Sequence, residues 1–225
     1  MTMDVATNLQ YMRRTIKQAS EKSKRNPDEI TIIGVTKYVT IERTREAIQA
    51  GIKNLGENRP DGFMEKYNHI GIDAKWHFIG TLQSRKVKDV INKVDVVHSL
   101  DRLSLVKEIN KRATEQKDCF VQVNVSGEES KHGLRPDEVI PFIKSIERYE
   151  NVHVVGLMTM APHLEDKERL REFFQTLADL RNTIKHKKLA HAPCEYLSMG
   201  MSNDYEIAIE EGATHIRIGS DLVGQ

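Results

Sequence analysis

The stretch TIIGVTKYVTIERTREAIQAG, residues 31–51, contains one complete strand-then-helix pattern. Its first part, residues 31–37, is a short apolar and β-branched run that predicts a buried strand. Its second part, residues 41–51, places its apolar side chains on one side of a helix and ends at Gly51, the residue type expected just past a helix C-terminus. Repeated units of this kind force neighbouring strands to be parallel.

The same pattern recurs along the chain. Further strands are predicted at residues 54–58, 76–80, 94–100, 119–126, 154–160, 195–200 and 214–219. Helical spacing lies between them, at residues 102–113, 138–149, 168–184 and 203–212. Eight such strands in 225 residues favour one α/β domain over residues 1–225, a closed (β/α)8 TIM barrel, with an open doubly wound sheet as the structural alternative. An extra N-terminal helix is predicted from the apolar residues Val5, Leu9, Met12 and Ile16.

Composition limits the class of protein. The 34 Lys and Arg residues nearly balance the 33 Asp and Glu residues, which argues against nucleic acid or an anionic membrane as the main partner. No apolar run approaches the roughly 20 residues of a membrane span, and the start has no secretory h-region. Two cysteines form neither a disulfide framework nor a metal site. We therefore expect a cytoplasmic protein.

The predicted strands end in polar or small residues. Because the carboxyl ends of parallel strands meet at one face of a barrel, we expect these residues to gather there. They include Lys37, Asn58, Gln83, Asn124, Ser202 and Ser220, and the sixth strand brings Met158 and Met160 to the same face. Lys37 has two readings, since lysine is mostly exposed to solvent. It is either an ordinary surface residue at the end of its strand or an amine that a site requires.

Two consecutive loops, SMGMSND and IGSD, favour phosphate binding. In the first, Gly200 lets the backbone approach an anion closely, and Ser202 offers a hydroxyl just before a predicted helix. In the second, Gly219 and Ser220 follow the last strand, where many barrels bind phosphate. The alternative is a helix cap at Ser202 and a tight turn at Gly219. Their joint placement on the loops after strands seven and eight favours the phosphate.

A lysine facing a phosphate site indicates a phosphorylated carbonyl ligand. A lysine amine forms a Schiff base with an aldehyde when it is deprotonated, which burial promotes. Phosphorylated sugars and pyridoxal phosphate (PLP) both fit. Arg217 favours PLP, because strand alternation points it inward with His215, where a guanidinium can face a pyridine nitrogen. The alternative is that Arg217 pairs with an interior acid such as Glu57.

The motifs VTKY, GEN, WHFIGTLQSRK, GLMTM, LSMGMSNDYEIAI and GATHIRIGSDLVG together resemble the YggS/PROSC family of pyridoxal phosphate homeostasis proteins. The resemblance runs from about residue 32 to residue 224, in the family's order. It implies a fold similar to the N-terminal barrel of alanine racemase, and pyridoxal 5'-phosphate as the cofactor.

The resemblance also implies a role for particular residues. Lys37 would carry the PLP Schiff base, and Arg217 would lie beside the pyridine nitrogen. The other implied cofactor-binding residues are Asn58 and Met158 near the ring, Ser198, Met201 through its backbone, and Ser202, Gly219 and Ser220 at the phosphate. Ser220 stands where the family commonly has Thr, and it keeps the hydroxyl. Arg85 stands where the family's LQxNK motif has Asn, so the role of residues 83–86 is left open.

A racemase needs one base on each face of its substrate, and Lys37 supplies one. Alanine racemase takes the second, a tyrosine, from an additional domain of a partner subunit. This chain ends five residues after Ser220, which leaves Tyr38 and Tyr196 as candidates by proximity in sequence only. We therefore expect a monomeric PLP carrier rather than an enzyme, which buffers the cofactor or delivers it to PLP-dependent apoenzymes. The alternatives are a weak PLP-dependent amino-acid racemase and a sugar-phosphate aldolase.

Overall fold

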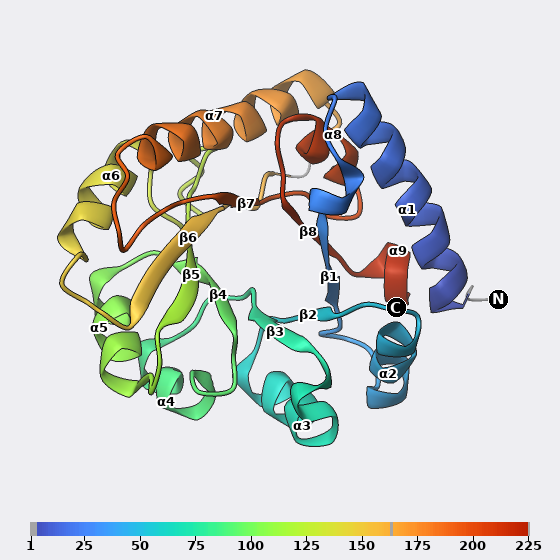
Figure 1. Ribbon diagram of the computed structural model, residues 1–225, viewed down its shortest axis with the longest axis horizontal. Helices are drawn as coiled ribbons and strands as arrows, with labels where there is room; N and C mark the ends of the chain where they lie inside the picture. The colour runs from blue at the N-terminus through green and yellow to red at the C-terminus, as the bar shows by residue number, and fades with distance from the viewer. Residues whose placement is uncertain (1–3, 163, 225) are drawn as a thin grey trace.

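The computed structural model describes residues 4–162 and 164–224 and contains a closed barrel of parallel strands. The strands follow one another around the barrel in chain order (Figure 1). They are β1 (Thr31–Val35), β2 (Asn54–Glu57), β3 (Lys75–Phe78), β4 (Val96–Leu100), β5 (Lys117–Gln122), β6 (Val152–Met158), β7 (Tyr196–Ser198) and β8 (His215–Ile218). The ring closes through β8 and β1, where Ile33 lies opposite Arg217. The predicted TIM barrel is confirmed, and the open sheet is wrong.

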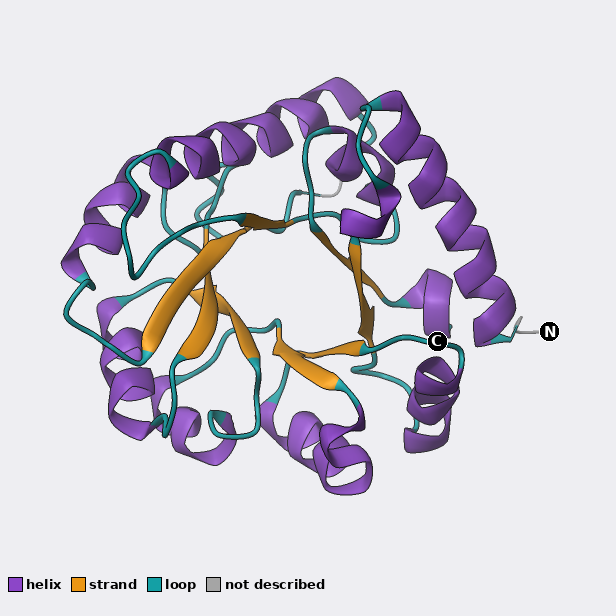
Figure 2. Ribbon diagram, viewed as in Figure 1, coloured by secondary structure: helices purple, strands orange, loops and turns teal. Residues whose placement is uncertain are grey.

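Helices cover the outside of the strands, as Figure 2 shows. They are α1 (Val5–Lys22), α2 (Ile41–Gln49), α3 (Pro60–Ile70), α4 (Val87–Val90), α5 (Leu103–Arg112), α6 (Pro136–Ser145), α7 (Lys167–Lys185), α8 (Tyr205–Glu210) and α9 (Ser220–Val223). Three short 3-10 segments are η1 (Pro27–Glu29), η2 (Gly71–Asp73) and η3 (Ser84–Lys86). The extra N-terminal helix α1 is confirmed, with its four predicted apolar residues buried.

Several strands are shorter than their apolar patterns predict. β1 ends at Val35 rather than Lys37, because the chain turns after Thr36, where the Val39 amide donates to the Thr36 carbonyl at 3.1 Å. Likewise, α8 begins two residues later than predicted from the sequence, at Tyr205. Apolar runs therefore marked the strands well, but the residues at their ends belong to turns. These turns carry the candidate site.

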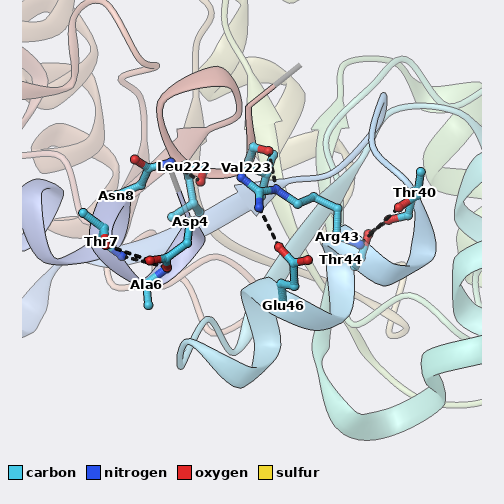
Figure 3. Close-up of polar contacts among 10 residues, drawn as sticks. All are labelled: Asp4, Ala6, Thr7, Asn8, Thr40, Arg43, Thr44, Glu46, Leu222 and Val223. Atoms are coloured by element: carbon cyan, nitrogen blue, oxygen red, sulfur yellow. Dashed lines mark hydrogen bonds and ion pairs between the residues drawn. The ribbon is translucent and has the colours of Figure 1, made fainter. Parts of the chain in front are cut away.

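The first and last parts of the chain are joined by side chains on α1 and α2 (Figure 3). Asn8 on α1 donates from Nδ2 to the Leu222 carbonyl at 3.0 Å. Arg43 on α2 donates from Nε to the Val223 carbonyl at 2.8 Å. Both acceptors are carbonyls of α9, which have no partner within so short a helix. α9 is held in this way, and Ser220 at its start is held with it.

Apolar side chains fill the space between the barrel and its covering helices. Both cysteines, Cys119 and Cys194, are free and buried. Burial raises the pKa of the Cys194 thiol to about 12, so it stays protonated at neutral pH. Within the described ranges, no helix has the length and apolar character to cross a membrane.

Candidate functional site

A cavity of about 440 Å³ opens at the carboxyl end of the barrel. Its volume lies in the range of roughly 300–1,000 Å³ typical of small-molecule pockets. Seven of the nine predicted cofactor-binding residues line it: Lys37, Asn58, Met201, Ser202, Arg217, Gly219 and Ser220. Tyr38, Ile79, Met160 and Asn203 are among the other lining residues. The structure thus brings together residues from the first, second, seventh and last strand–helix connections.

Lys37 lies in the turn after β1, and its side chain is both exposed and part of the cavity wall. Its Nζ sits 4.8 Å from the centre of the Tyr38 ring, a cation–π distance. Tyr38 is itself 73% exposed, so the pair stands at the rim of the cavity. The lysine is solvent-exposed, and it borders the cavity.

A buried ion pair supports this turn from behind. Lys66 on α3 donates from Nζ to Glu57 Oε1 at 2.7 Å and to the Thr36 carbonyl at 2.6 Å. The Thr36 hydroxyl donates to the same Glu57 oxygen at 2.7 Å. Glu57 therefore pairs with Lys66, and the alternative that Arg217 pairs with Glu57 is wrong. The contact fixes the residue immediately before Lys37.

The two predicted phosphate loops meet through their hydroxyls. Ser220 Oγ lies 3.3 Å from Ser202 Oγ. Ser202 does not cap α8, because the cap residue is Asp204. Asp204 Oδ1 accepts from the Met201 amide at 2.6 Å, so that backbone N–H is already engaged within its own turn. What the two loops present together is a pair of serine hydroxyls.

Glycine is required at two places next to the cavity. Gly200 has φ +96°, and a Cβ there would lie 2.7 Å from Ala208 Cβ. A Cβ on Gly80, which lines the cavity, would lie 2.2 Å from the Asn58 carbonyl oxygen. The first glycine lets α8 pack against the turn that bears Ser202, and the second lets the β2 and β3 connections approach each other.

Arg217 is a buried polar residue of the cavity wall, with 4% of its surface exposed. Its Nη1 donates to Ser198 Oγ at 2.6 Å, and its Nη2 donates to the Thr159 carbonyl at 2.8 Å. Burial lowers the pKa of the guanidinium to about 10, although nearby Asp204 raises it. Arg217 thus remains a cation at neutral pH, and its strand alternation into the barrel is as predicted.

The other two predicted residues, Ser198 and Met158, are not among those that line the cavity. Ser198 lies behind Arg217 as its acceptor. Met158 packs in the barrel interior with Val96, Phe120 and Val155. Their contact with a cofactor therefore stays a prediction.

Three polar residues considered from the sequence lie elsewhere. Gln83 accepts from Arg85 Nε at 2.9 Å within its own loop. Asn124 Oδ1 accepts from the Gly127 amide at 3.1 Å and organises the turn after β5. Tyr196 is the first residue of β7, at the amino end of the barrel, opposite the cavity. It cannot act as a base near Lys37.

Sequence reasoning missed two buried histidines. His77 on β3 and His98 on β4 lie inside the barrel and contact each other at 2.8 Å. His98 also contacts Ser198 Oγ at 2.9 Å, which connects the pair to Arg217. A histidine in the middle of an otherwise apolar predicted strand was the available signal. Asp204 and Thr159 carried no comparable signal, since both lie in turns whose contacts depend on the fold.

Comparison with known proteins places this geometry in a family. The family model described as alanine racemase, N-terminal domain, matches residues 7–225. The pyridoxal phosphate homeostasis protein of Aquifex aeolicus is 40% identical over 227 residues, covering 99% of each chain. The chain belongs to the pyridoxal phosphate homeostasis protein family.

The family assignment agrees with solved structures. PipY from Synechococcus elongatus with PLP bound superposes with a TM-score of 0.85 at 26% identity, covering 98% of this chain and all of that one. Alanine racemase from Clostridium difficile in complex with cycloserine gives a TM-score of 0.78 at 16% identity, covering 97% of this chain and 58% of the racemase. The second likeness is one of fold. Membership of the family, predicted from the motifs, is confirmed.

Proposed function

We propose that the protein binds pyridoxal 5'-phosphate at the Lys37 cavity and takes part in PLP homeostasis, as a carrier that buffers or delivers the cofactor. The observation that carries this proposal is the convergence of an exposed amine, two hydroxyls 3.3 Å apart and a buried arginine on one cavity. These groups fit an aldehyde, a phosphate and a ring nitrogen, respectively. The name of the Aquifex relative and the PLP-bound PipY support the choice of ligand.

Each of the cavity groups has a separate task in this proposal. Lys37 holds the cofactor as a Schiff base, its nitrogen bonding the aldehyde carbon while one water leaves. Ser202 and Ser220 donate to the phosphate, next to Gly219 and Met201. Arg217 donates toward the ring nitrogen, and Asn58 borders the ring. Because the cofactor brings its own reactive aldehyde, the chain needs only to capture it and release it.

Reduction with borohydride tests the attachment. After reduction of the PLP-loaded protein and digestion, we expect mass spectrometry to find the cofactor on the peptide that contains Lys37. Lys37→Ala should lose this adduct and keep the circular dichroism of the parent. Lys131→Ala is the matched control, since its amine also lies near the cavity, 3.4 Å from the Met160 carbonyl. An adduct on another lysine, or none, contradicts the proposal.

A carrier rather than a racemase is proposed because of the bases at the cavity. Among the described residues that line it, Lys37 and Tyr38 are the candidates to move a proton, and they are neighbours in one turn. Racemisation needs bases on opposite faces of the substrate. We expect exchange of the amino-acid Cα hydrogen with solvent to be no faster than with free PLP. Exchange at enzyme-like rates, lost in Tyr38→Phe, would establish a weak racemase instead.

The proposal includes action as a monomer in the cytoplasm and transfer to PLP-dependent apoenzymes. The rim position of Lys37 supports transfer, because an acceptor protein or solvent can reach it. Transfer is measured by mixing the loaded protein with an apoenzyme and following the appearance of its activity. The association state is measured by sedimentation with and without PLP. A stable dimer would contradict the monomer, and activation no faster than with free PLP would contradict delivery.

A further inference from the structure

A chain of hydrogen-bonded side chains crosses the barrel interior from β2 to the cavity. His77 contacts Asn54 Oδ1 through Nε2 at 3.0 Å and His98 Nε2 through Nδ1 at 2.8 Å. His98 Nδ1 contacts Ser198 Oγ at 2.9 Å, and Ser198 Oγ accepts from Arg217 at 2.6 Å. Asn54 begins β2 at the amino end of the barrel, whereas Arg217 lines the cavity at the other end. We refer to these five residues as the interior chain.

The Asn54 end of the interior chain sets the direction of the bonds, because its amide oxygen faces His77 Nε2. A guanidinium can only donate, and an amide oxygen can only accept. His77 must therefore carry its proton on Nε2, which leaves Nδ1 to accept from His98 Nε2. His98 Nδ1 then accepts in turn, so the Ser198 hydroxyl must donate to it. The Ser198 oxygen therefore only accepts from Arg217. Each hydrogen along the interior chain then has one acceptor.

The chain requires both imidazoles to be neutral, and the barrel interior favours that state. Burial lowers the pKa of His77 well below its ordinary value, with His215 and Lys75 lowering it further. Burial also lowers the pKa of His98, together with His77, His215 and Arg217. Phe120 stacks on His98 with ring centres 4.4 Å apart and holds the plane of the imidazole. The ring therefore can neither rotate nor charge easily.

We propose that His77 and His98 are positioning residues for Arg217. Through Ser198 they hold the guanidinium so that this part of the cavity wall only donates hydrogen bonds. Their effect is to keep the Ser198 hydrogen pointing away from the cavity, so that Ser198 cannot compete with Arg217 as a donor or turn away from it. The wall then selects a ligand atom that accepts a hydrogen bond, such as an unprotonated pyridine nitrogen. The inference rests on the proposed function in taking PLP as that ligand.

The interior chain is a brace rather than a proton relay. Passing a proton along it would require the guanidinium to give one up and the amide oxygen of Asn54 to receive one. Neither group does so at neutral pH. The predicted consequence is therefore a fixed orientation, with one tautomer for each histidine.

The first test measures the tautomers in the cofactor-free protein. Nitrogen-15 NMR of histidine-labelled protein at pH 7.5 distinguishes an imidazole protonated on Nε2 from one protonated on Nδ1. We expect His77 and His98 both to be neutral and protonated on Nε2. A His98 ring protonated on Nδ1, or charged, overturns the proposal. This measurement needs no substitution in the chain and no bound ligand.

The second test compares PLP with an analogue that has carbon in place of the ring nitrogen. We expect the parent to bind the analogue at least about tenfold more weakly, the factor that corresponds to one modest hydrogen bond. In His98→Phe, which keeps the stacking on Phe120, the ratio of the two Kd values should fall toward one. His98→Asn, with an oxygen acceptor near the position of Nδ1, should restore it. His215→Phe is the matched control, because His215 also packs on Phe120 but bonds to Thr214.

The outcomes separate this inference from the proposed function. If the parent protein takes up no PLP at Lys37, the proposed function fails, whereas the tautomer result still decides whether the brace exists. If the parent binds PLP and His98→Phe shows the parent's Kd ratio and absorbance spectrum, only the positioning role fails. A change of ratio in His215→Phe equal to that in His98→Phe would also overturn it, because the effect would then be one of packing alone.

Discussion

Arg217 and Lys37 border the same cavity but differ in burial, and this difference determines what each can do. Lys37 is exposed at the rim, so its amine is free to reach a ligand or an acceptor protein. Arg217 is buried and already donates two hydrogen bonds, to Ser198 and to the Thr159 carbonyl. Lys37 is therefore suited to reversible capture, and Arg217 to recognition.

Replacing Arg217 should change both stability and binding. Arg217→Ala leaves the buried Thr159 carbonyl and Ser198 hydroxyl without their donor, which we expect to cost about 1–3 kcal/mol in the free energy of unfolding. Urea unfolding followed by circular dichroism measures this, and absorbance measures the PLP bound per protein, which should fall. Arg181→Ala is the control, because Arg181 donates to the Glu195 carbonyl, outside the cavity. Full PLP stoichiometry in Arg217→Ala would show that Arg217 is structural only.

At the level of elements, the site depends on short connections held by neighbours. α9, only four residues long, is too short to be stable by itself and is tied to α1 and α2 through Asn8 and Arg43 (Figure 3). The turn before α8 is closed by Asp204. The β1 turn is tied to β2 and α3 by the buried pair of Glu57 and Lys66. The helices outside the barrel thus position residues at its mouth.

Breaking the buried ion pair tests that element-level support. Lys66→Met leaves the Glu57 carboxylate, only 1% exposed, without its cation. We expect the free energy of unfolding to fall by about 3–5 kcal/mol. Chemical unfolding of the single variant, and of the double variant Glu57→Gln with Lys66→Met, measures the effect.

The double variant serves as the control for the buried charge. Since it removes the carboxylate's charge, it should be more stable than Lys66→Met alone. Equal stability of the two variants would mean that the unpaired charge is not the cause of the loss.

At the level of the whole molecule, the barrel encloses polar groups that must stay uncharged. His77, His98 and His215 lie close together inside it, with ring centres 5.1–6.5 Å apart. Burial lowers the pKa of all three, that of His215 to about 4. Closure of the barrel is what removes them from water.

This burial makes stability depend on pH. The folded pKa of each histidine lies below its value of about 6.5 in the unfolded chain, so between the two values the unfolded chain binds more protons. The free energy of unfolding should therefore be greatest above about pH 6.5 and decrease as the pH falls toward 4, by up to about 4 kcal/mol per pH unit for the three groups together. Urea unfolding at pH 7.5 and pH 5.5 measures this dependence. His215→Phe should show a smaller decrease, and equal stability of the parent at both pH values would contradict the assignment.

Local patterns in the sequence determined much of this protein. Apolar runs and helical spacing predicted the eight strands and the helices α1, α2, α5, α6, α7 and α8, because burial on one face or both produces a periodic pattern of apolar side chains. The sequence analysis did not predict α3, α4 or α9. Small and polar residues after the strands indicated the cavity, because parallel strands all end at one face of a barrel. Seven predicted residues consequently line one cavity. The motifs determined the family.

The tertiary structure alone decided which polar groups meet. His98 and Ser198 are 100 positions apart, and Arg217 bonds a carbonyl 58 positions away. The sequence left Glu57 as an alternative partner for Arg217, whereas the structure pairs Glu57 with Lys66. These contacts depend on strand register, on the closure of β8 against β1 and on turns of a few residues. None of these is recorded in local periodicity, because each is set by the packing of distant segments against one another.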